Sequence, residues 1–118
     1  MRSVNIKEVE AFLQDFKMKK KIWGVLFLAR EKNFNTLSTL EISGKYREDI
    51  LESLTVSDYV EGPMPEEWHG SKEMWVFGKV VKSVPIYIKI TLGTSGDQAI
   101  CISFHIAEYP LSYPLESK

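Results

Sequence analysis

The chain has 118 residues, of which 44% are hydrophobic and 26% are charged, and its formal net charge is −1 at pH 7. This length and composition predict one ordinary globular domain, residues 1–118, unlike a disordered or membrane-embedded chain. The nearly balanced charge gives no support for nucleic-acid binding through overall attraction, because domains that bind in this way are usually basic. A local basic surface within residues 68–92 is still compatible with these numbers.

The N-terminal region contains no predicted membrane anchor or signal peptide. Its longest apolar run, residues 22–29, has eight residues and is too short to span a bilayer. Charged residues interrupt the segment before this run, which is unlike a secretion signal. The single cysteine, Cys101, excludes an intrachain disulfide and a cysteine-based zinc site. We therefore expect a cytoplasmic protein without membrane contact.

The N-terminal half is expected to form helices around one strand. Asn5 can cap a helix that ends near Lys20. The apolar residues of this helix recur at helical spacing, at Ile6, Val9, Phe12, Leu13 and Phe16. The apolar run 22–29 predicts a buried strand. Two shorter helices are expected over 33–40 and 44–54. The apolar side of the second carries Tyr46, Ile50, Leu51 and Leu54.

The C-terminal half is expected to form strands. Residues 55–71 contain two prolines and two glycines, which predict a long connection rather than a regular element. Three strands follow, over 73–81, 84–92 and 99–106, and the loop 93–98 suits an antiparallel hairpin. Helices followed by strands predict the α+β class, with an antiparallel sheet covered on one face by the N-terminal helices.

Alternation divides the last two strands into two faces. In the strand 84–92, one face carries Ile86, Ile88 and Ile90, and the other carries Tyr87 and Lys89. In the strand 99–106, one face carries Ile100, Ile102 and Phe104, and the other carries Cys101, Ser103 and His105. Both apolar sides are expected beneath the helices, because only this arrangement buries both of them. The remaining side chains then share the outer face.

The side chains of the outer face suit phosphodiester chemistry. Pairing of the two strands places Tyr87 opposite Ser103 or His105, with Lys89 nearby. RNA can be cleaved without a metal or cofactor when one group takes the proton of the 2′-hydroxyl and another protonates the leaving 5′-oxygen. His105 can act as acid or base at neutral pH, and Tyr87 can donate to phosphate or stack on a base. Lys89 and Lys79 can bind phosphate.

The tail after the last strand is expected to leave the sheet, because neither Pro110 nor Pro114 can donate to a ladder hydrogen bond. We expect the tail to fold near the outer face, with Glu108 or Tyr109 close to the imidazole of His105.

The same outer face also fits an ordinary half-exposed sheet that performs no chemistry. His69 is expected in an exposed loop, and two histidines 36 positions apart do not indicate a metal site. Cys101 has no neighbouring motif for nucleophilic catalysis and is expected to be passive. Glycine-rich phosphate loops and the GxSxG hydrolase motif are absent from the sequence.

The ordered motifs of the C-terminal half resemble the MqsR family of type II toxin–antitoxin toxins, which have a RelE-like fold. The resemblance rests on LTVSDYVEGP (54–63), MWVFGKVV (74–81), IYIKITLG (86–93) and ICISFHIAEYPLSYP (100–114). The short helices before them also fit, with residues 21–40 similar to a more distant branch. The resemblance implies an endoribonuclease that cuts mRNA and inhibits translation. It also implies a partner antitoxin, often with a helix-turn-helix region.

Position by position, the resemblance implies two catalytic residues. The family's catalytic tyrosine falls on Tyr87, and its C-terminal catalytic lysine falls on His105, where an imidazole is the better proton donor near neutrality. Two positions depart from the family pattern, because Glu61 stands where the family has a lysine and Val76 where it has a glutamine. Further contacts to RNA are assigned to Trp75, Glu61 and Ser103.

Two other hypotheses remain open at this stage. A non-catalytic protein-binding module would use the same sheet face or an edge strand, with Trp68, Trp75 and Tyr109 as contact residues. A small-molecule site would lie between the sheet and the loop 62–71, with Trp68 as a lid.

Overall fold

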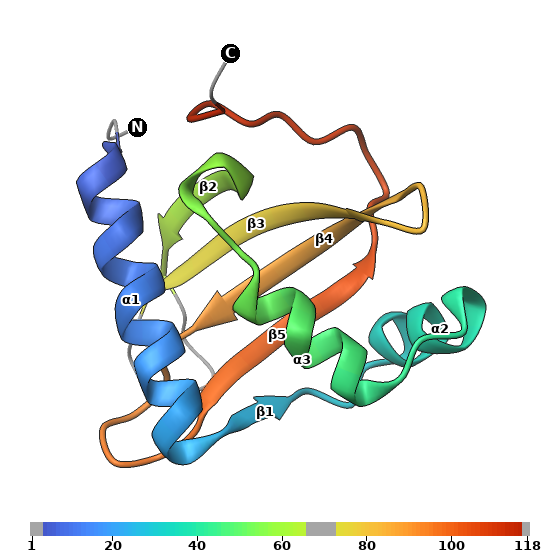
Figure 1. Ribbon diagram of the computed structural model, residues 1–118, viewed down its shortest axis with the longest axis horizontal. Helices are drawn as coiled ribbons and strands as arrows, with labels where there is room; N and C mark the ends of the chain where they lie inside the picture. Colours follow the sequence, from blue (N-terminus) through green and yellow to red (C-terminus); the bar gives the residue numbers. More distant parts are fainter. Residues whose placement is uncertain (1–3, 66–72, 117–118) are drawn as a thin grey trace.

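The computed structural model describes residues 4–65 and 73–116. In chain order the elements are α1 (Ile6–Trp23), β1 (Val25–Phe27), α2 (Glu31–Leu40), α3 (Gly44–Glu52), the 3₁₀ helix η1 (Val56–Asp58), β2 (Tyr59–Met64), β3 (Met74–Val81), β4 (Val84–Thr91) and β5 (Ala99–Ile106). Figure 1 shows α1 and α3 crossing one face of the sheet, with α2 beside the end of β5. The predicted α+β class, with helices over one face of the sheet, is confirmed.

The sheet has five strands in the order β1-β5-β4-β3-β2, and β1 pairs with β5 in parallel while the other pairs are antiparallel. The sheet is therefore mixed, and the predicted antiparallel arrangement holds for every pair except this one. The predicted strand 22–29 is reduced to β1, because α1 continues through Trp23 and ends at Gly24, whose φ of +83° favours glycine. The predicted connection 55–71 contains β2, which pairs with β3 through an irregular register. Across residues 4–65 and 73–116, no helix combines the length and apolar character needed to cross a membrane.

Helix α1 packs on the sheet through aromatic contacts. Its N-terminus is capped as predicted, since the Glu8 amide donates to Asn5 Oδ1 over 2.9 Å. The ring of Phe12 stacks on Trp75 of β3, with centroids 4.9 Å apart, and on Phe77 at 6.1 Å. The expected apolar stripe is buried except at Ile6, which is 51% exposed. These contacts place the core between α1 and the centre of the sheet.

A β-bulge in β5 overturns part of the predicted alternation. Lys89 pairs with Ser103, but the next residue, Ile90, pairs with Cys101, so Ile102 is the extra residue. Cys101 therefore joins the core beneath the helices, whereas Ile100 lies opposite Thr91 on the other face. The assignment of Cys101 to the outer face, and of Ile100 to the helix side, is wrong for this reason. A single inserted residue exchanges the two faces of a strand.

Beyond the end of β1, side chains of α2 bond to backbone groups of β5 that no strand among the described residues pairs with. The side-chain amide of Asn33 donates to the Ile102 carbonyl over 3.0 Å and accepts from the Phe104 amide over 2.9 Å. Thr36 Oγ1 accepts from the Ile106 amide over 3.1 Å. Both side chains are buried, so they satisfy backbone groups that water does not reach. The bulge and the start of α2 are therefore fixed to one another.

Candidate functional site

Tyr87 and His105 meet on the face of the sheet opposite α1. They occupy directly paired positions of β4 and β5. Their rings stack, with centroids 5.2 Å apart and planes inclined by 17°. Alternation allowed Tyr87 to lie opposite either Ser103 or His105, and the structure places it opposite His105. The two rings therefore lie face to face across the β4–β5 pair.

The imidazole of His105 has a defined orientation. Its Nδ1 lies 3.0 Å from the carbonyl oxygen of Ile106. A carbonyl oxygen only accepts, so Nδ1 carries the proton and Nε2 of the neutral ring has a free lone pair. The side chain is only half-buried. Nε2 is therefore an available proton acceptor on this face.

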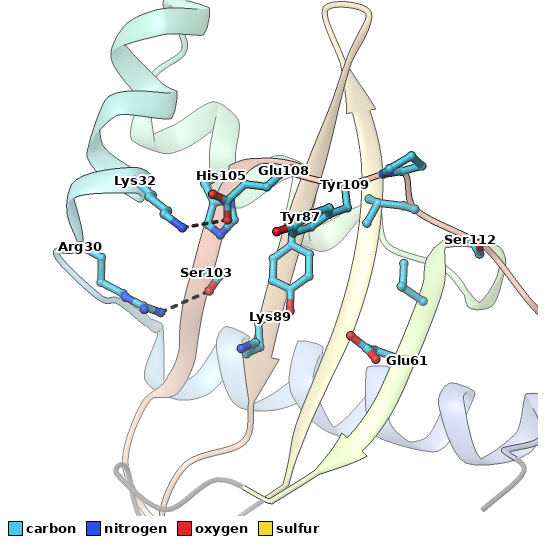
Figure 2. Close-up of a pocket in the computed structure, with 13 residues that line it drawn as sticks. Arg30, Lys32, Glu61, Tyr87, Lys89, Ser103, His105, Glu108, Tyr109 and Ser112 are labelled. Atoms are coloured by element: carbon cyan, nitrogen blue, oxygen red, sulfur yellow. Dashed lines mark hydrogen bonds and ion pairs between the residues drawn. The ribbon is translucent and has the colours of Figure 1, made fainter. Parts of the chain in front are cut away.

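The phenol of Tyr87 stays protonated near neutral pH. Burial, and next the negative charge of Glu61, raise the pKa of this hydroxyl above its ordinary value of 10.0. The hydroxyl is consequently a hydrogen-bond donor rather than a base. Figure 2 shows the Tyr87 ring directed toward the end of the site that holds Lys89 and Glu61.

Lys89 and Ser103 form the next pair of residues along the two strands. The Lys89 ammonium lies 5.8 Å from the centroid of the Tyr87 ring, within the range of a cation–π contact. Burial, and next the positive charge of Arg30, lower the pKa of this ammonium from its ordinary value. Lys89 is therefore a stronger acid than an ordinary surface lysine.

Arg30 reaches Ser103 from a segment outside the sheet. It lies between β1 and α2, and its Nη1 donates to Ser103 Oγ over 3.4 Å. Sequence reasoning missed Arg30, because it belongs to none of the predicted elements. Asn33, three positions later, could have indicated that Arg30 lies near β5, because the Asn33 side chain holds the start of α2 against that strand.

These side chains line a pocket of about 630 Å³. In Figure 2, Arg30, Ser103 and Lys89 lie toward one end of it, and His105 lies toward the other with Lys32 and Glu108. Lys32 Nζ lies 2.8 Å from Glu108 Oε1, which ties α2 to the C-terminal tail. This hydrogen bond, more than any other effect, lowers the pKa of the Glu108 carboxyl.

The C-terminal tail forms one wall of the pocket. Tyr109 and Leu111 line it together with His105 and Glu108, as expected for a tail that folds near the imidazole. The tail crosses β3 at Gly78, where an added Cβ would lie 2.6 Å from the Tyr113 hydroxyl and 2.7 Å from Leu111 Cδ1. The absence of a side chain at Gly78 therefore allows the tail to lie directly on the strand.

Several predicted site residues lie elsewhere. Lys79 is paired with the buried Ile86, on the helix side of the sheet, and its ammonium lies 2.9 Å from Asp58. Lys79 therefore does not share a face with Tyr87 and Lys89, so the structure does not bring this predicted phosphate ligand to the pocket. Trp75 is only 7% exposed and belongs to the core. Val76 does face the pocket side, directly between Glu61 and Lys89 in the register, but its side chain is fully buried.

Trp68 and His69 lie outside the described residues, as does part of the loop 62–71. Within residues 4–65 and 73–116, the structure contains no group of three or more His, Cys, Asp or Glu side chains arranged to hold a metal ion. The described groups can provide a neutral imidazole that accepts a proton, a phenol that donates, and two cations that attract an anion.

Comparison of the chain with protein-family models, with curated proteins and with solved structures gives no significant match.

Proposed function

We propose that this chain is the toxin component of a type II toxin–antitoxin system and that its pocket cleaves mRNA without a metal ion. The observation that carries the proposal is the stacked pair of Tyr87 and His105, with the ammonium of Lys89 5.8 Å from the tyrosine ring. A free imidazole nitrogen beside a phenol and an ammonium supplies the groups that RNA cleavage requires. The resemblance of the C-terminal motifs to the MqsR family points to the same activity.

The proposed reaction uses the 2′-hydroxyl of RNA as its nucleophile. His105 Nε2 takes the proton of this hydroxyl, and the 2′-oxygen attacks the adjacent phosphorus. The bond from phosphorus to the 5′-oxygen then breaks, and that oxygen leaves with a proton from Lys89, whose lowered pKa suits this step. The products are a 2′,3′-cyclic phosphate and a 5′-hydroxyl, so every atom is accounted for.

Tyr87 has a different part in this reaction. Its raised pKa makes it a poor proton shuttle, but its hydroxyl can donate a hydrogen bond to a phosphate oxygen that gains charge. Its ring also holds the imidazole in place by stacking.

Cleavage of RNA by the purified protein tests the proposal. We expect His105→Ala to slow cleavage by about 10²-fold or more, as removal of a general base does. Tyr87→Phe should keep the stack and slow cleavage less. Replacing the 2′-hydroxyl at the cut position with hydrogen should block the reaction. Lys7→Gln, an exposed change on α1, serves as the control. Intact RNA after incubation with wild-type protein that is folded would refute the activity.

A second candidate function is a non-catalytic module that binds a protein on the same face. The observation in its favour is Tyr109, which is 81% exposed at the edge of the pocket. An aromatic side chain in this position is typical of a contact residue. If this function is correct, His105→Ala leaves complex formation with the partner unchanged, whereas Tyr109→Ala weakens it. The pull-down of a neighbouring gene product provides the partner for this measurement.

A further inference from the structure

The end of the pocket away from His105 combines a hydroxyl with two cations. Ser103 Oγ accepts a hydrogen bond from Arg30 Nη1 over 3.4 Å. A hydroxyl that accepts in this way still has its own proton to donate. Lys89 lies on the neighbouring strand directly opposite Ser103. Three donors, from β4, β5 and the segment between β1 and α2, therefore lie at one end of the pocket.

The positive charge at this place is not neutralised by a direct contact. Within residues 4–65 and 73–116, the Lys89 ammonium has no hydrogen bond or ion pair with another residue, although the side chain is half-buried. Arg30 has only a hydroxyl as its side-chain partner there, and a guanidinium stays charged at any physiological pH. The two cations repel each other, as the effect of Arg30 on Lys89 shows. An anion bound between them would remove this repulsion.

Among the described residues, the carboxylate on this side of the pocket forms no ion pair with Lys89 or Arg30. Glu61 lies on β2 and is exposed, and Val76 of β3 separates it from Lys89 in the register. Two strand spacings place their Cα atoms roughly 10 Å apart. Its charge raises the pKa of Lys89 less than burial and Arg30 lower it, so this exposed carboxylate weakens the positive potential without replacing a bound anion.

The backbone of Arg30 is fixed before any ligand binds. Its amide donates to the Leu28 carbonyl over 2.9 Å, and its carbonyl accepts from the Phe34 amide over 3.0 Å. The buried Asn33 then holds the start of α2 against the bulge of β5. A donor whose backbone is held in this way loses less entropy when it binds an anion.

We infer that Arg30, Lys89 and the Ser103 hydroxyl form a phosphate subsite that holds the non-bridging oxygens of the RNA phosphodiester beside the Tyr87–His105 pair. The inference rests on the proposed function and names the groups that position its substrate. A guanidinium can contact two phosphate oxygens at once, which a lysine cannot do. Arg30 therefore sets the orientation of the phosphate, and Lys89 supplies the second charge until it gives its proton to the leaving 5′-oxygen.

Binding of a short single-stranded RNA methylated at every 2′-oxygen tests the subsite, because this RNA cannot be cleaved. We expect Arg30→Gln to weaken binding by about tenfold, the usual loss for a hydrogen bond to a charged group. The slope of log K against log salt should fall by about 0.7, the value for one phosphate contact to a single strand. Arg30→Lys should keep the slope and lose only part of the affinity. Lys7→Gln, on α1, is the control that removes one positive charge elsewhere.

A second variant tests the sign of the electrostatic effect. Glu61→Gln removes the carboxylate on this side and should tighten binding about twofold, as expected for a charge roughly 10 Å away in water. Equal affinities of wild type and Arg30→Gln for the methylated RNA would overturn the subsite. It would also be overturned if an oligo-glutamate of the same charge competed as well as RNA, since the anion would then belong to an acidic protein.

The outcome separates the subsite from the proposed cleavage. If Arg30→Gln weakens binding but wild-type protein leaves unmodified RNA intact, the subsite stands and the cleavage is refuted. If wild-type protein cleaves RNA and Arg30→Gln binds and cleaves it equally well, the cleavage stands and the subsite is refuted.

Discussion

On the face covered by α1, the strands β3 and β4 contribute aromatic and aliphatic side chains, and the ring of Phe12 stacks on Trp75 at 4.9 Å. On the opposite face β4 carries Tyr87 and Lys89, which line the pocket together with Arg30, Ser103 and His105. Free energy from apolar burial is therefore concentrated on one face, and the groups capable of chemistry lie on the other. Substitutions on the two faces should have separable effects on stability and on binding.

The largest expected effect is the loss of an aromatic contact on the helix side. Phe12→Ala should lower the free energy of unfolding by about 3–5 kcal/mol, since it leaves a cavity beneath α1. Urea unfolding followed by circular dichroism measures this loss. Ile6→Ala on the same helix is the control, because Ile6 is 51% exposed and should contribute less than about 1 kcal/mol. Equal losses for the two variants would mean that the core is not where the structure places it.

Asn33 connects the two faces, and its removal should affect both. Asn33→Ala leaves the Ile102 carbonyl and the Phe104 amide without their partner and should lower the free energy of unfolding by about 2–3 kcal/mol. The same change should release the start of α2 and so weaken RNA binding through Arg30. Asn35→Ala, at an exposed position of α2, is the matched control. A change in stability with no change in binding would show that α2 does not position Arg30.

Alternation predicted the two faces of β4 correctly but those of β5 only in part, and the reason lies in the period of the two strands. Alternation correctly separated Tyr87, Lys89 and His105 from the buried isoleucines of β4, because a regular strand has a strict period of two. It failed at Cys101, because a bulge adds one residue and no residue in ICISF marks the place. The bulge depends on partners supplied by Asn33, which lies 69 positions away from Ile102.

The pocket itself could not be predicted from the strands alone. Arg30 and Lys32 reach it from a segment that is distant in sequence and carries no periodic signal, whereas the tail was expected near His105. Lys79 was predicted to bind phosphate without a face being assigned to it, because the register of β3 and β4 decides that face. Contacts between distant segments follow from tertiary packing, which overrides local pattern.

The pH dependence of stability shows on which face of the sheet the Cys101 thiol lies. Burial raises the pKa of this thiol to about 12 in the folded protein, against about 9 for an exposed thiol. The folded state then keeps a proton that the unfolded state loses, so stability falls as pH rises above about 9, by about 1.4 kcal/mol per pH unit. Cys101→Ala should lack this part of the pH dependence. A thiol reagent should modify the native protein slowly.

A Cys101 thiol on the pocket face would give a different result. If the thiol faced the pocket, as simple alternation predicts, wild type and Cys101→Ala would show the same dependence on pH. The reagent would then modify folded protein at a rate close to that of the unfolded chain.

The smallest expected effect on stability is at Gly78, where the pocket face meets the tail. Gly78→Ala places a methyl group against the ends of the Tyr113 and Leu111 side chains, which can rotate away, so the free energy of unfolding should change by less than about 1 kcal/mol. The tail should nevertheless shift, and amide exchange over residues 109–115 should become faster. Gly44→Ala, whose added Cβ would meet nothing within 4 Å, should leave exchange unchanged. Because Leu111 lines the pocket, the shift should also weaken RNA binding while Tyr87 and His105 stay in place. If Gly78→Ala lowered the free energy of unfolding by several kcal/mol, the tail would be part of the stabilising core. The two faces of β3 would then not differ in their effects on stability and binding.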